Sequence, residues 1–478
     1  MRSFADHLDA PTGEGALRNH PHSGAAGGAA CGDLVRIAVQ IDGDRVTQAG
    51  FDADGCGALT AAASAIVEGI DGGSFFNACR WGAEEVARSL GGLTPAKRHA
   101  AELAADALHR ALGAVAKDGA VRVKESGRRT LVAMSGGVDS TAAAQLALDA
   151  GDEVVAVTLE LWSDPGTDGE KSCCSPQAVG GARELAHRMA IPHITLDLRD
   201  RFRAEVVDRF LDGYARGRTP NPCVHCNGEV RFEAMLELAD RLGASTLVTG
   251  HYARVGRDDR GPLIRAAADP NKDQSYMLAK LDPELLDRIS FPLGGLTKDV
   301  VRALARDAGL PVADKRESQD LCFVAGLGGR AFLQRHGGPR LRRPGEIVDL
   351  QGTVLGRHEG QHNYTVGQRR GLGLATPEPL YVLEKDASAN RIVVGPKAAL
   401  ATKRVPLEDT TLHRPAAEVE TVRLRYHSKP LACRVHVQDD GNIELELDET
   451  ANGVAPGQLA CLMRQDRVVG EGTIGEPR

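Results

Sequence analysis

Residues 130–151 have the sequence TLVAMSGGVDSTAAAQLALDAG, and this stretch decides the fold of the central part of the chain. Its first residues predict a short buried strand, and its last twelve predict a helix that ends at Gly151. The loop SGGVDS, Ser135 to Ser140, lies between them. Paired glycines let a phosphate approach the backbone, and the first turn of a helix offers N–H groups and a positive dipole end. We therefore expect a phosphate-binding loop.

The side chains of this loop support the same interpretation. Ser135 and Ser140 add hydroxyl donors, and Asp139 is expected either to orient the loop or to help hold Mg²⁺. A pair of glycines alone would indicate only an ordinary turn, and no lysine follows the loop as in a Walker P-loop. The complete SGGVDS loop between strand and helix resembles the PP-loop of ATP pyrophosphatases. These enzymes cleave ATP to AMP and pyrophosphate by adenylating a substrate oxygen.

Strands and helices alternate on both sides of this loop. EVVAVTLEL, HITLDL and STLVTGHYA predict further strands, with helical segments between them. Such alternation is typical of a parallel sheet with helices on both faces, as in Rossmann-like α/β domains. From residue 343 onward, short alternating strands around turns predict a small β domain and a β-barrel. The fold class expected is therefore multidomain α/β.

The length and composition limit the possible functions. The chain has 478 residues, which predicts three or four domains. Its net charge of −7 argues against non-specific coating of nucleic acid but leaves room for a local basic track. No stretch approaches the ~20 apolar residues of a membrane helix, and the N-terminus lacks the apolar core of a secretory signal, so we expect a cytoplasmic protein. Ten cysteines in such a chain favour metal or sulfur chemistry over disulfides.

Three of these cysteines lie in distinctive surroundings. RTPNPCVHCN, from Arg218, presents Cys223 and Cys226 at C-x-x-C spacing, in a loop that two prolines stiffen before a helix. A third, Cys322, lies in SQDLCF; alone, it would be interpreted as a core residue. Together with GRTPNP, TGHYA, NKDQSY and GQRRGLG, these motifs make residues 128–478 similar to the tRNA-specific 2-thiouridylases of the MnmA/TrmU family.

This resemblance implies a reaction in which sulfur replaces the C2 oxygen of the wobble uridine of tRNA. ATP, with Mg²⁺, adenylates that oxygen, and a persulfide sulfur displaces AMP. The family's nucleophilic cysteine matches Cys226 and its persulfide carrier matches Cys322. The implied partners are tRNAs with a wobble uridine, such as those for Lys, Glu and Gln, and a cysteine desulfurase or another sulfur-relay donor. No membrane partner is expected.

The resemblance also implies binding residues. Those for ATP are Ala133, Met134, Ser135, Gly136, Gly137, Val138, Asp139, Ser140, Leu159 and Gly250. Those for tRNA or its target base are Asn221, Pro222, Cys223, Lys272, Asp273, Gln274, Arg425 and Tyr426. His251 is interpreted as a structural hydrogen-bonding residue rather than a base. Six arginines are expected to contact phosphates: Arg335, Arg340, Arg342, Arg343, Arg369 and Arg370. The alternative is that they only form a solvated surface.

Cys223 departs from the family pattern, because much of the family has Asp at this position, where the carboxylate is a candidate general base. Three thiolates, from Cys223, Cys226 and Cys322, would suit a [4Fe–4S] cluster with one open iron that delivers sulfide. The alternative keeps a persulfide and disulfide cycle of Cys226 and Cys322, with Cys223 as a spectator. The sequence leaves both open.

Residues 1–120 are additional to that family and are similar to the iron–sulfur scaffold domain of the NifU/IscU type. The ligand motifs of such scaffolds match Cys31, Asp33, Cys56 and His99, whereas Ala100 replaces the third scaffold cysteine. The remaining set could bind a cluster or zinc with mixed ligands. A docking module for a cysteine desulfurase and a structural remnant are the alternatives.

Four domains are expected: residues 1–120 as the scaffold-like domain, 127–335 as the catalytic domain, 336–402 as a small central tRNA-binding domain and 403–478 as a β-barrel. Two other functions are considered. One is a PP-loop enzyme that adenylates a small molecule, which would leave the cysteines unexplained. The other is an iron–sulfur scaffold with an inert nucleotide module, which predicts a damaged loop, whereas SGGVDS is intact.

Overall fold

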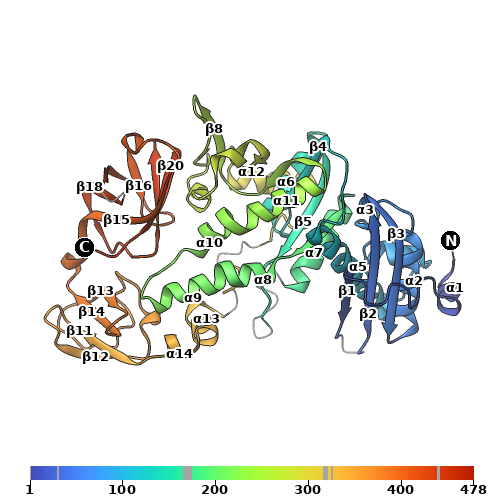
Figure 1. Cartoon of the computed structure of the whole chain (residues 1–478), viewed down its shortest axis with the longest axis horizontal. Coiled ribbons are helices and arrows are strands. Elements are labelled where there is room, and N and C mark those ends of the chain that lie inside the picture. The colour runs from blue at the N-terminus through green and yellow to red at the C-terminus, as the bar shows by residue number, and fades with distance from the viewer. Residues whose placement is uncertain are drawn as a thin grey trace.

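The computed structural model of the chain describes residues 2–28, 32–164, 175–315, 321–324, 327–438 and 442–477. The N-terminal α+β domain lies at one end, the parallel-sheet domain in the middle, and two β domains at the other end (Figure 1). The multidomain α/β architecture expected from the sequence is confirmed.

The N-terminal domain packs helices against an antiparallel sheet with the order β1-β2-β3. Its strands are β1 (Ser23–Gly27), β2 (Leu34–Asp42) and β3 (Arg45–Asp54). Its helices are α1 (Phe4–Asp9), α2 (Gly57–Ile70), α3 (Phe75–Ala78), α4 (Ala83–Ser89) and α5 (Arg98–Asp118). Strand β1 has the sequence SGAAG, which does not predict a strand because glycine and alanine are depleted in strands. Small residues suit it because a Cβ on Gly24 would lie 2.3 Å from the Ala107 carbonyl of α5.

The central sheet is parallel throughout, with the strand order β10-β7-β4-β5-β6. Its strands are β4 (Ser126–Ala133), β5 (Glu153–Glu160), β6 (His193–Asp197), β7 (Ala244–Thr249) and β10 (Ile289–Ser290). Helices that accompany it are α6 (Val138–Asp149), α7 (Pro176–Arg188), α11 (Phe232–Arg241) and α12 (Lys298–Asp307). Because β4 and β7 are neighbours, their carboxyl ends meet at one edge, where ligands bind in open α/β sheets.

Two long helical segments lead from this sheet toward the β domains (Figure 1). The first comprises α8 (Arg199–Phe202), a π-turn (Arg203–Val207) and α9 (Asp208–Ala215); the second comprises α10 (Pro222–His225), a π-turn (Cys226–Arg231) and α11. The expectation that Cys223 and Cys226 lie in a loop is therefore wrong. Asn221 caps this helix by accepting from the Cys223 and Val224 backbone N–H groups, and Pro222 occupies the first helical position.

The small β domain follows α13 (Gly329–His336) and α14 (Gly338–Leu341). Its sheet has the order β12-β11-β14-β13. The strands are β11 (Gly345–Val348), β12 (Val354–His358), β13 (Tyr381–Asp386) and β14 (Arg391–Gly395). Short 3₁₀ helices connect elements along the chain: Pro95–Lys97, Ser275–Leu278, Pro283–Arg288, Gln361–Asn363, Lys397–Leu400 and Ala416–Glu418.

The C-terminal strands form a barrel that closes because β15 pairs with both β18 and β20. Its strands are β15 (Ala401–Leu412), β16 (Thr421–Arg423), β17 (Leu431–Val437), β18 (Ile443–Asn452), β19 (Leu459–Arg464) and β20 (Arg467–Ile474). A hairpin from the central domain, β8 (Arg254–Asp258) and β9 (Gly261–Arg265), extends this sheet by pairing with β20. Asp258 of the hairpin accepts from Arg414 at 2.6 Å and Arg464 at 3.0 Å, which attaches the barrel to the central domain.

The N-terminal domain packs on the edge strand β6 through α5. A Cβ on Gly113 of α5 would lie 2.2 Å from the Thr195 carbonyl, so glycine allows the close approach. The Cys79 carbonyl accepts from the His193 backbone N–H at 3.1 Å and from His187 Nε2 at 3.0 Å. These contacts join the two domains through buried backbone and side-chain groups.

Candidate active site

The SGGVDS loop connects β4 to α6 at the carboxyl edge of the sheet. Gly136 has φ +69°, a conformation that side-chain-bearing residues rarely adopt. Ser140 Oγ accepts from the Ser135 backbone N–H at 3.1 Å and donates to the Gly137 carbonyl at 3.2 Å, which closes the loop on itself. Gly137 is the N-cap of α6 and supplies no side-chain cap, so the first N–H groups of the helix remain available to an anion.

Gly250, at the end of β7, packs directly against this loop. A Cβ at this position would lie 2.7 Å from the Ser140 backbone nitrogen and 2.8 Å from the Asp139 carbonyl carbon. Because both contacts are with backbone, any side chain would displace the loop. The predicted nucleotide residue Gly250 therefore also sets the distance between β7 and the start of α6.

Asp139 is held by two residues that sequence reasoning missed. Lys298 Nζ donates to its carboxylate oxygens at 2.7 and 2.8 Å, and the Tyr252 hydroxyl donates to it at 2.8 Å. A second lysine, Lys315, donates to the Gly136 carbonyl at 3.0 Å. These lysines lie more than 150 residues along the chain from the loop, so no local motif identified them. These contacts orient the Asp139 carboxylate, and its role toward Mg²⁺ stays a prediction.

A cavity of about 240 Å³ opens beside the loop. It is lined by Ala133, Met134, Ser135, Asp139, Ser140, Val157, Thr158, Leu159, Leu161, Arg231, Met235, Thr249, Gly250, His251 and Gln274. The structure thus brings Leu159 of β5 and Gly250, which follows β7, together with the loop. Gly136, Gly137 and Val138 do not line the cavity themselves; they lie in the loop between the lining residues Ser135 and Asp139. The cavity combines apolar walls with backbone donors, a chemistry that suits a nucleotide with its phosphates.

His251 borders this cavity in neutral form. Burial lowers its pKa to about 3, and the nearby Arg231 adds to that effect. Its Nδ1 lies 2.7 Å from the Thr249 hydroxyl, and its ring contacts those of Phe232 and Phe291. The surroundings agree with a structural hydrogen-bonding residue.

The three cysteines lie beyond the nucleotide cavity, along α10 and its π-turn and after α12. Cys226 is buried, whereas Cys223 and Cys322 are half-buried. Cys223 lines a second cavity, of about 390 Å³, to which Leu321 also contributes. Phe323 anchors the Cys322 segment, since its ring lies 5.0 Å from that of Phe332. The Cys223 segment therefore lines the second cavity through Cys223 itself, and the Cys322 segment lines it through Leu321.

The C-terminal barrel reaches the same region. Burial raises the pKa of Tyr426, and the neighbouring charges of Asp273 and Cys223 contribute to the rise. The Tyr276 hydroxyl donates to the Leu459 carbonyl at 2.8 Å and lies beside the Asn221 side chain. The predicted base residues of the Cys223 segment and the barrel residue Tyr426 are therefore spatial neighbours. Arg425 is exposed next to them.

The predicted tRNA residues 272–274 have three different environments. Lys272 is half-buried at the surface. Asp273 is buried and accepts from Arg423 at 2.6 Å and from the Ser275 hydroxyl at 2.9 Å. Gln274 exchanges hydrogen bonds with the Tyr252 backbone at 2.8 and 2.9 Å and lines the nucleotide cavity. Their contacts with tRNA stay a prediction.

The arginine group divides in a similar way. Arg335 pairs with the buried Asp164 at 2.9 Å, and Arg342 donates to the Gln334 carbonyl at 3.0 Å. All six side chains are exposed, the other four being Arg340, Arg343, Arg369 and Arg370. Phosphate contact by the six arginines stays a prediction.

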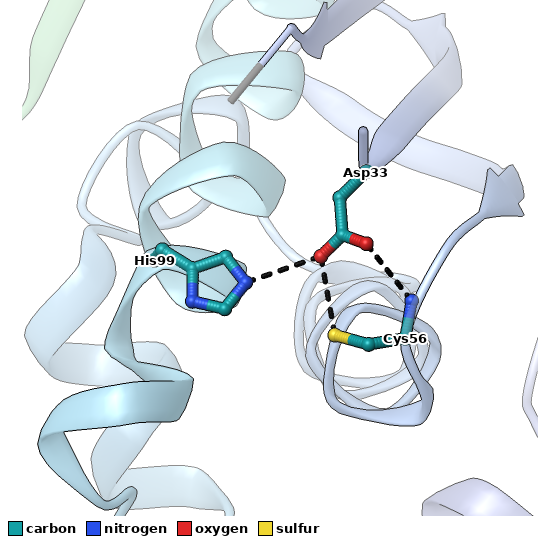
Figure 2. A group of neighbouring side chains, drawn as sticks. All are labelled: Asp33, Cys56 and His99. Carbon is teal, nitrogen blue, oxygen red and sulfur yellow. Dashed lines mark hydrogen bonds and ion pairs between the residues drawn. The ribbon is translucent and has the colours of Figure 1, made fainter. Parts of the chain in front are cut away.

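A candidate metal site lies in the N-terminal domain. Asp33 is 2% exposed; its carboxylate accepts from the Cys56 backbone N–H at 3.0 Å and lies 3.1 Å from both Cys56 Sγ and His99 Nε2 (Figure 2). The ligand atoms of Asp33, Cys56 and His99 all lie within 4.8 Å of one another. The fourth predicted ligand, Cys31, lies outside the described residues. The oxygen, sulfur and nitrogen donors fit a zinc or iron ion.

Across the described residues, this is the only group of three or more such side chains that converges so closely. Cys223, Cys226 and Cys322 are described and do not form one. A single tetrahedral ion would need their sulfurs nearer together, whereas a four-iron cluster binds its thiolates at separate irons. The cluster at these cysteines stays a prediction.

Four family models match consecutive parts of the chain. They are described as a NifU-like N terminal domain (residues 2–119), a tRNA methyl transferase HUP domain (128–326), a tRNA methyl transferase PRC-barrel domain (330–396) and an aminomethyltransferase beta-barrel domain (408–474). The chain is also similar to the bifunctional protein NifU/MnmA of Rubrobacter xylanophilus, at 44% identity over 98% of this chain and 97% of that protein. The chain belongs to the NifU/MnmA family.

Two further relatives match the larger part of the chain. The proteins named tRNA-specific 2-thiouridylase MnmA from Rhodospirillum centenum and Chloroflexus aurantiacus are each 46% identical. They cover 72% and 73% of this chain, and the alignments span 91% and 98% of their own lengths. The described residues contain no helix long and apolar enough to cross a membrane.

Proposed function

We propose that the chain is a tRNA-uridine 2-sulfurtransferase that thiolates the wobble uridine of tRNA at the expense of ATP. One observation carries this proposal: the helical segment 222–235 borders both cavities. Cys223 lines the larger cavity, Arg231 and Met235 line the nucleotide cavity, and Cys226 lies between them in the sequence. A base in the larger cavity would therefore have a thiol beside it, and the same helical segment leads on to the nucleotide cavity. The names of the relatives support the same reaction.

In the persulfide cycle, the uracil C2 oxygen attacks the α-phosphorus of ATP and pyrophosphate leaves. The terminal sulfur of a persulfide on Cys322 then attacks C2, and AMP leaves with the oxygen. Cys226 thiolate attacks the Cys322 sulfur, which releases 2-thiouridine and forms a Cys226–Cys322 disulfide. An external thiol reduces that disulfide. Adenylation is needed because an unactivated carbonyl oxygen is a poor leaving group, and a thiolate or persulfide is a strong nucleophile near neutral pH.

Mg²⁺ bound with ATP would neutralise charge on the phosphates. Within the chain, Lys298 and Lys315 add positive charge next to the loop, and the N-terminus of α6 donates N–H groups. Because Lys298 pairs with Asp139, we assign Asp139 the role of fixing the loop. The protein would thus contribute position and charge, which is the main contribution expected in nucleotidyl transfer.

A second mechanism uses Cys223, Cys226 and Cys322 as ligands of a [4Fe–4S] cluster that donates sulfide. Its motivation is the thiol at position 223, since a thiol replaces a carboxylate poorly as a general base. In both mechanisms Asn221, Pro222 and the thiol-bearing segment face the base. The N-terminal Asp33–Cys56–His99 group would hold zinc, iron or a cluster as cargo, or receive sulfur from a cysteine desulfurase.

We assign the exposed arginines Arg340, Arg343, Arg369, Arg370 and Arg425 to the phosphates of tRNA, and expect wobble-uridine tRNAs for Lys, Glu and Gln as substrates. Two family descriptions name methyl transfer instead. Methyl transfer would not need ATP cleavage to AMP and pyrophosphate, so the nucleotide loop favours sulfur transfer, for which the cysteine segments supply the thiols.

Release of pyrophosphate in the presence of tRNA tests the function. Full-length protein with Mg²⁺, ATP and a persulfide donor should release pyrophosphate only when a wobble-uridine tRNA is added, and digested tRNA should contain 2-thiouridine. Release with a small molecule but not with tRNA would indicate another adenylating enzyme. Absence of release under all conditions would favour an inert nucleotide module.

A further inference from the structure

The larger cavity receives residues from three domains. The central domain contributes Cys223 and its flanking turn, the small β domain contributes residues of the 3₁₀ helix Gln361–Asn363, and the barrel contributes Gln458. Part of this wall is therefore remote in sequence from the cysteine motifs.

His362 is the unusual member of this wall. Its side chain is buried, with the residue only 4% exposed, and neither ring nitrogen makes a hydrogen bond of regular geometry among the described residues, although the Leu341 backbone lies close enough to interact with the ring. The nearby His358 is equally buried but has both nitrogens bonded, to the Asn390 carbonyl at 3.2 Å and the Gly360 N–H at 3.1 Å. Unpartnered buried polar atoms are costly and rare, so a partner from outside the chain would explain His362.

The imidazole ring of His362 interacts as a neutral group. Burial lowers the pKa of His362, Arg330 lowers it further, and the Leu341 carbonyl opposes this only in part. A neutral imidazole offers one N–H donor and one bare nitrogen acceptor. Arg330 is itself fixed, because its Nε donates to Asn363 Oδ1 at 2.8 Å.

The other walls suit a planar base. Phe210, Tyr214 and Leu333 supply aromatic and apolar surface, and proteins commonly hold an unstacked base between such side chains and bind its Watson–Crick edge. The C2 oxygen of a target uracil must face the nucleotide and the thiols. On the ring, N3–H is the neighbour of the C2 carbonyl and the C4 carbonyl follows it, so this edge is free to contact the walls to the side of the thiols.

We propose that His362 is a positioning residue that hydrogen-bonds the N3–C4 edge of the wobble uracil in this cavity. The inference rests on the proposed function and extends it, because it places the 3₁₀ helix of the small β domain in the active site. Uracil offers a donor at N3 and an acceptor at O4, either of which a neutral imidazole can pair. Loss of this contact is expected to lower kcat rather than the affinity for tRNA, because phosphate contacts dominate the affinity for the whole tRNA.

Substitution of His362 tests this role in the full-length protein. His362→Leu should lower kcat for thiolation about tenfold, as expected for loss of one hydrogen bond to a buried group, while the Kd for tRNA changes less than about twofold. His362→Gln and His362→Asn keep a polar atom near Nε2 and Nδ1 respectively, and at least one should restore most of kcat. His436→Gln, on the exposed face of β17, is the matched control and should behave as wild type. An unchanged kcat in His362→Leu would overturn the proposal.

A modified substrate separates a direct contact from a structural effect. In tRNA that carries N3-methyluridine at the wobble position, wild type should lose activity, and His362→Leu should lose little more. Independent, multiplicative losses would show that the residue and the base edge do not interact, and would also overturn the proposal. ATP affinity without tRNA and the melting temperature report whether the variant is folded. If wild type itself fails to thiolate unmodified tRNA, the proposed function fails instead.

Discussion

Lys298 Nζ donates to both carboxylate oxygens of Asp139, at 2.7 and 2.8 Å, and joins α12 to the first turn of α6. The lysine is only 8% exposed, whereas the Asp139 side chain is 31% exposed, so the pair is partly shielded from water. The ion pair fixes an acidic side chain that would otherwise repel phosphates at the helix N-terminus. It also places a positive charge next to the nucleotide loop.

Loss of this lysine should weaken ATP binding. Lys298→Met leaves the Asp139 carboxylate without its cation in a half-buried site, and we expect at least about a tenfold rise in the Kd for ATP and a lower melting temperature. Lys397→Met, at an exposed position of the small β domain, is the control. Isothermal titration with ATP in the absence of tRNA measures the effect; equal Kd values for the two variants would contradict the assigned role.

The two loop glycines should respond differently to valine. Gly137 has φ −94° and nothing nearer to an added Cβ than Ser135 Oγ at 3.5 Å, so Gly137→Val should fold normally but block phosphate approach and abolish pyrophosphate release. Gly136 has φ +69°, so Gly136→Val should also lower stability, by about 1–2 kcal/mol. Thermal unfolding and pyrophosphate release measured on both variants check the distinction. Wild-type turnover in Gly137→Val would contradict the PP-loop assignment.

Cys322→Ser should abolish formation of 2-thiouridine but permit tRNA binding, because a hydroxyl cannot carry a persulfide. The pyrophosphate step should remain measurable, since it precedes sulfur transfer. Cys433→Ala, in the core of the barrel, is the control. Nucleoside analysis of digested tRNA decides the outcome, and undiminished product would place the sulfur carrier elsewhere.

The cluster mechanism predicts iron in the central domain. In the full-length Cys56→Ser/His99→Ala variant, which disables the N-terminal site, anaerobic reconstitution with iron and sulfide should load about four irons per chain if the cluster is the cubane type. Adding Cys223→Asp should remove them. A colourless protein that still thiolates tRNA from a persulfide donor would instead support the two-cysteine cycle.

Glu471 predicts a pH-dependent stability. Burial raises its pKa to about 7 from 4.5, and the carboxyl lies near Lys280 and Glu229 where the barrel meets the central domain. The folded state therefore binds more protons than the unfolded state between pH 4.5 and 7, and stability falls as pH rises through this window. The Glu471→Gln variant has no ionisable group at this position, so it does not lose this stability as pH rises. It should unfold like wild type near pH 4.5 and be more stable at pH 8, by up to about 3 kcal/mol.

Thermal melts of both proteins across this pH range measure the difference. Curves that stay parallel from pH 4.5 to pH 8 would show that Glu471 ionises normally in the folded protein. A barrel substitution away from the interface, such as His436→Gln, serves as the reference.

Local sequence determined the strands and the loop of the central domain. The segments around TLVAM, EVVAVTLEL and HITLDL are buried strands because their apolar runs must be covered on both faces of a parallel sheet. The SGGVDS turn was predictable because its glycines and the helix after it form one contiguous unit. Strand β1 was not predictable from the sequence, because its small residues, such as Gly24, have low intrinsic strand preference. The close contact with α5 requires small residues there.

Only the tertiary structure decided which distant residues meet. Lys298 at Asp139, Tyr426 beside Cys223, and His362 on the wall of the larger cavity all depend on domain packing. Sequence spacing carries information about neighbours on one helix or strand, whereas ion pairs and cavities between domains form from side chains that no local period relates. The chemistry was therefore recognisable from motifs, but the residues that position it became visible only once the chain was folded.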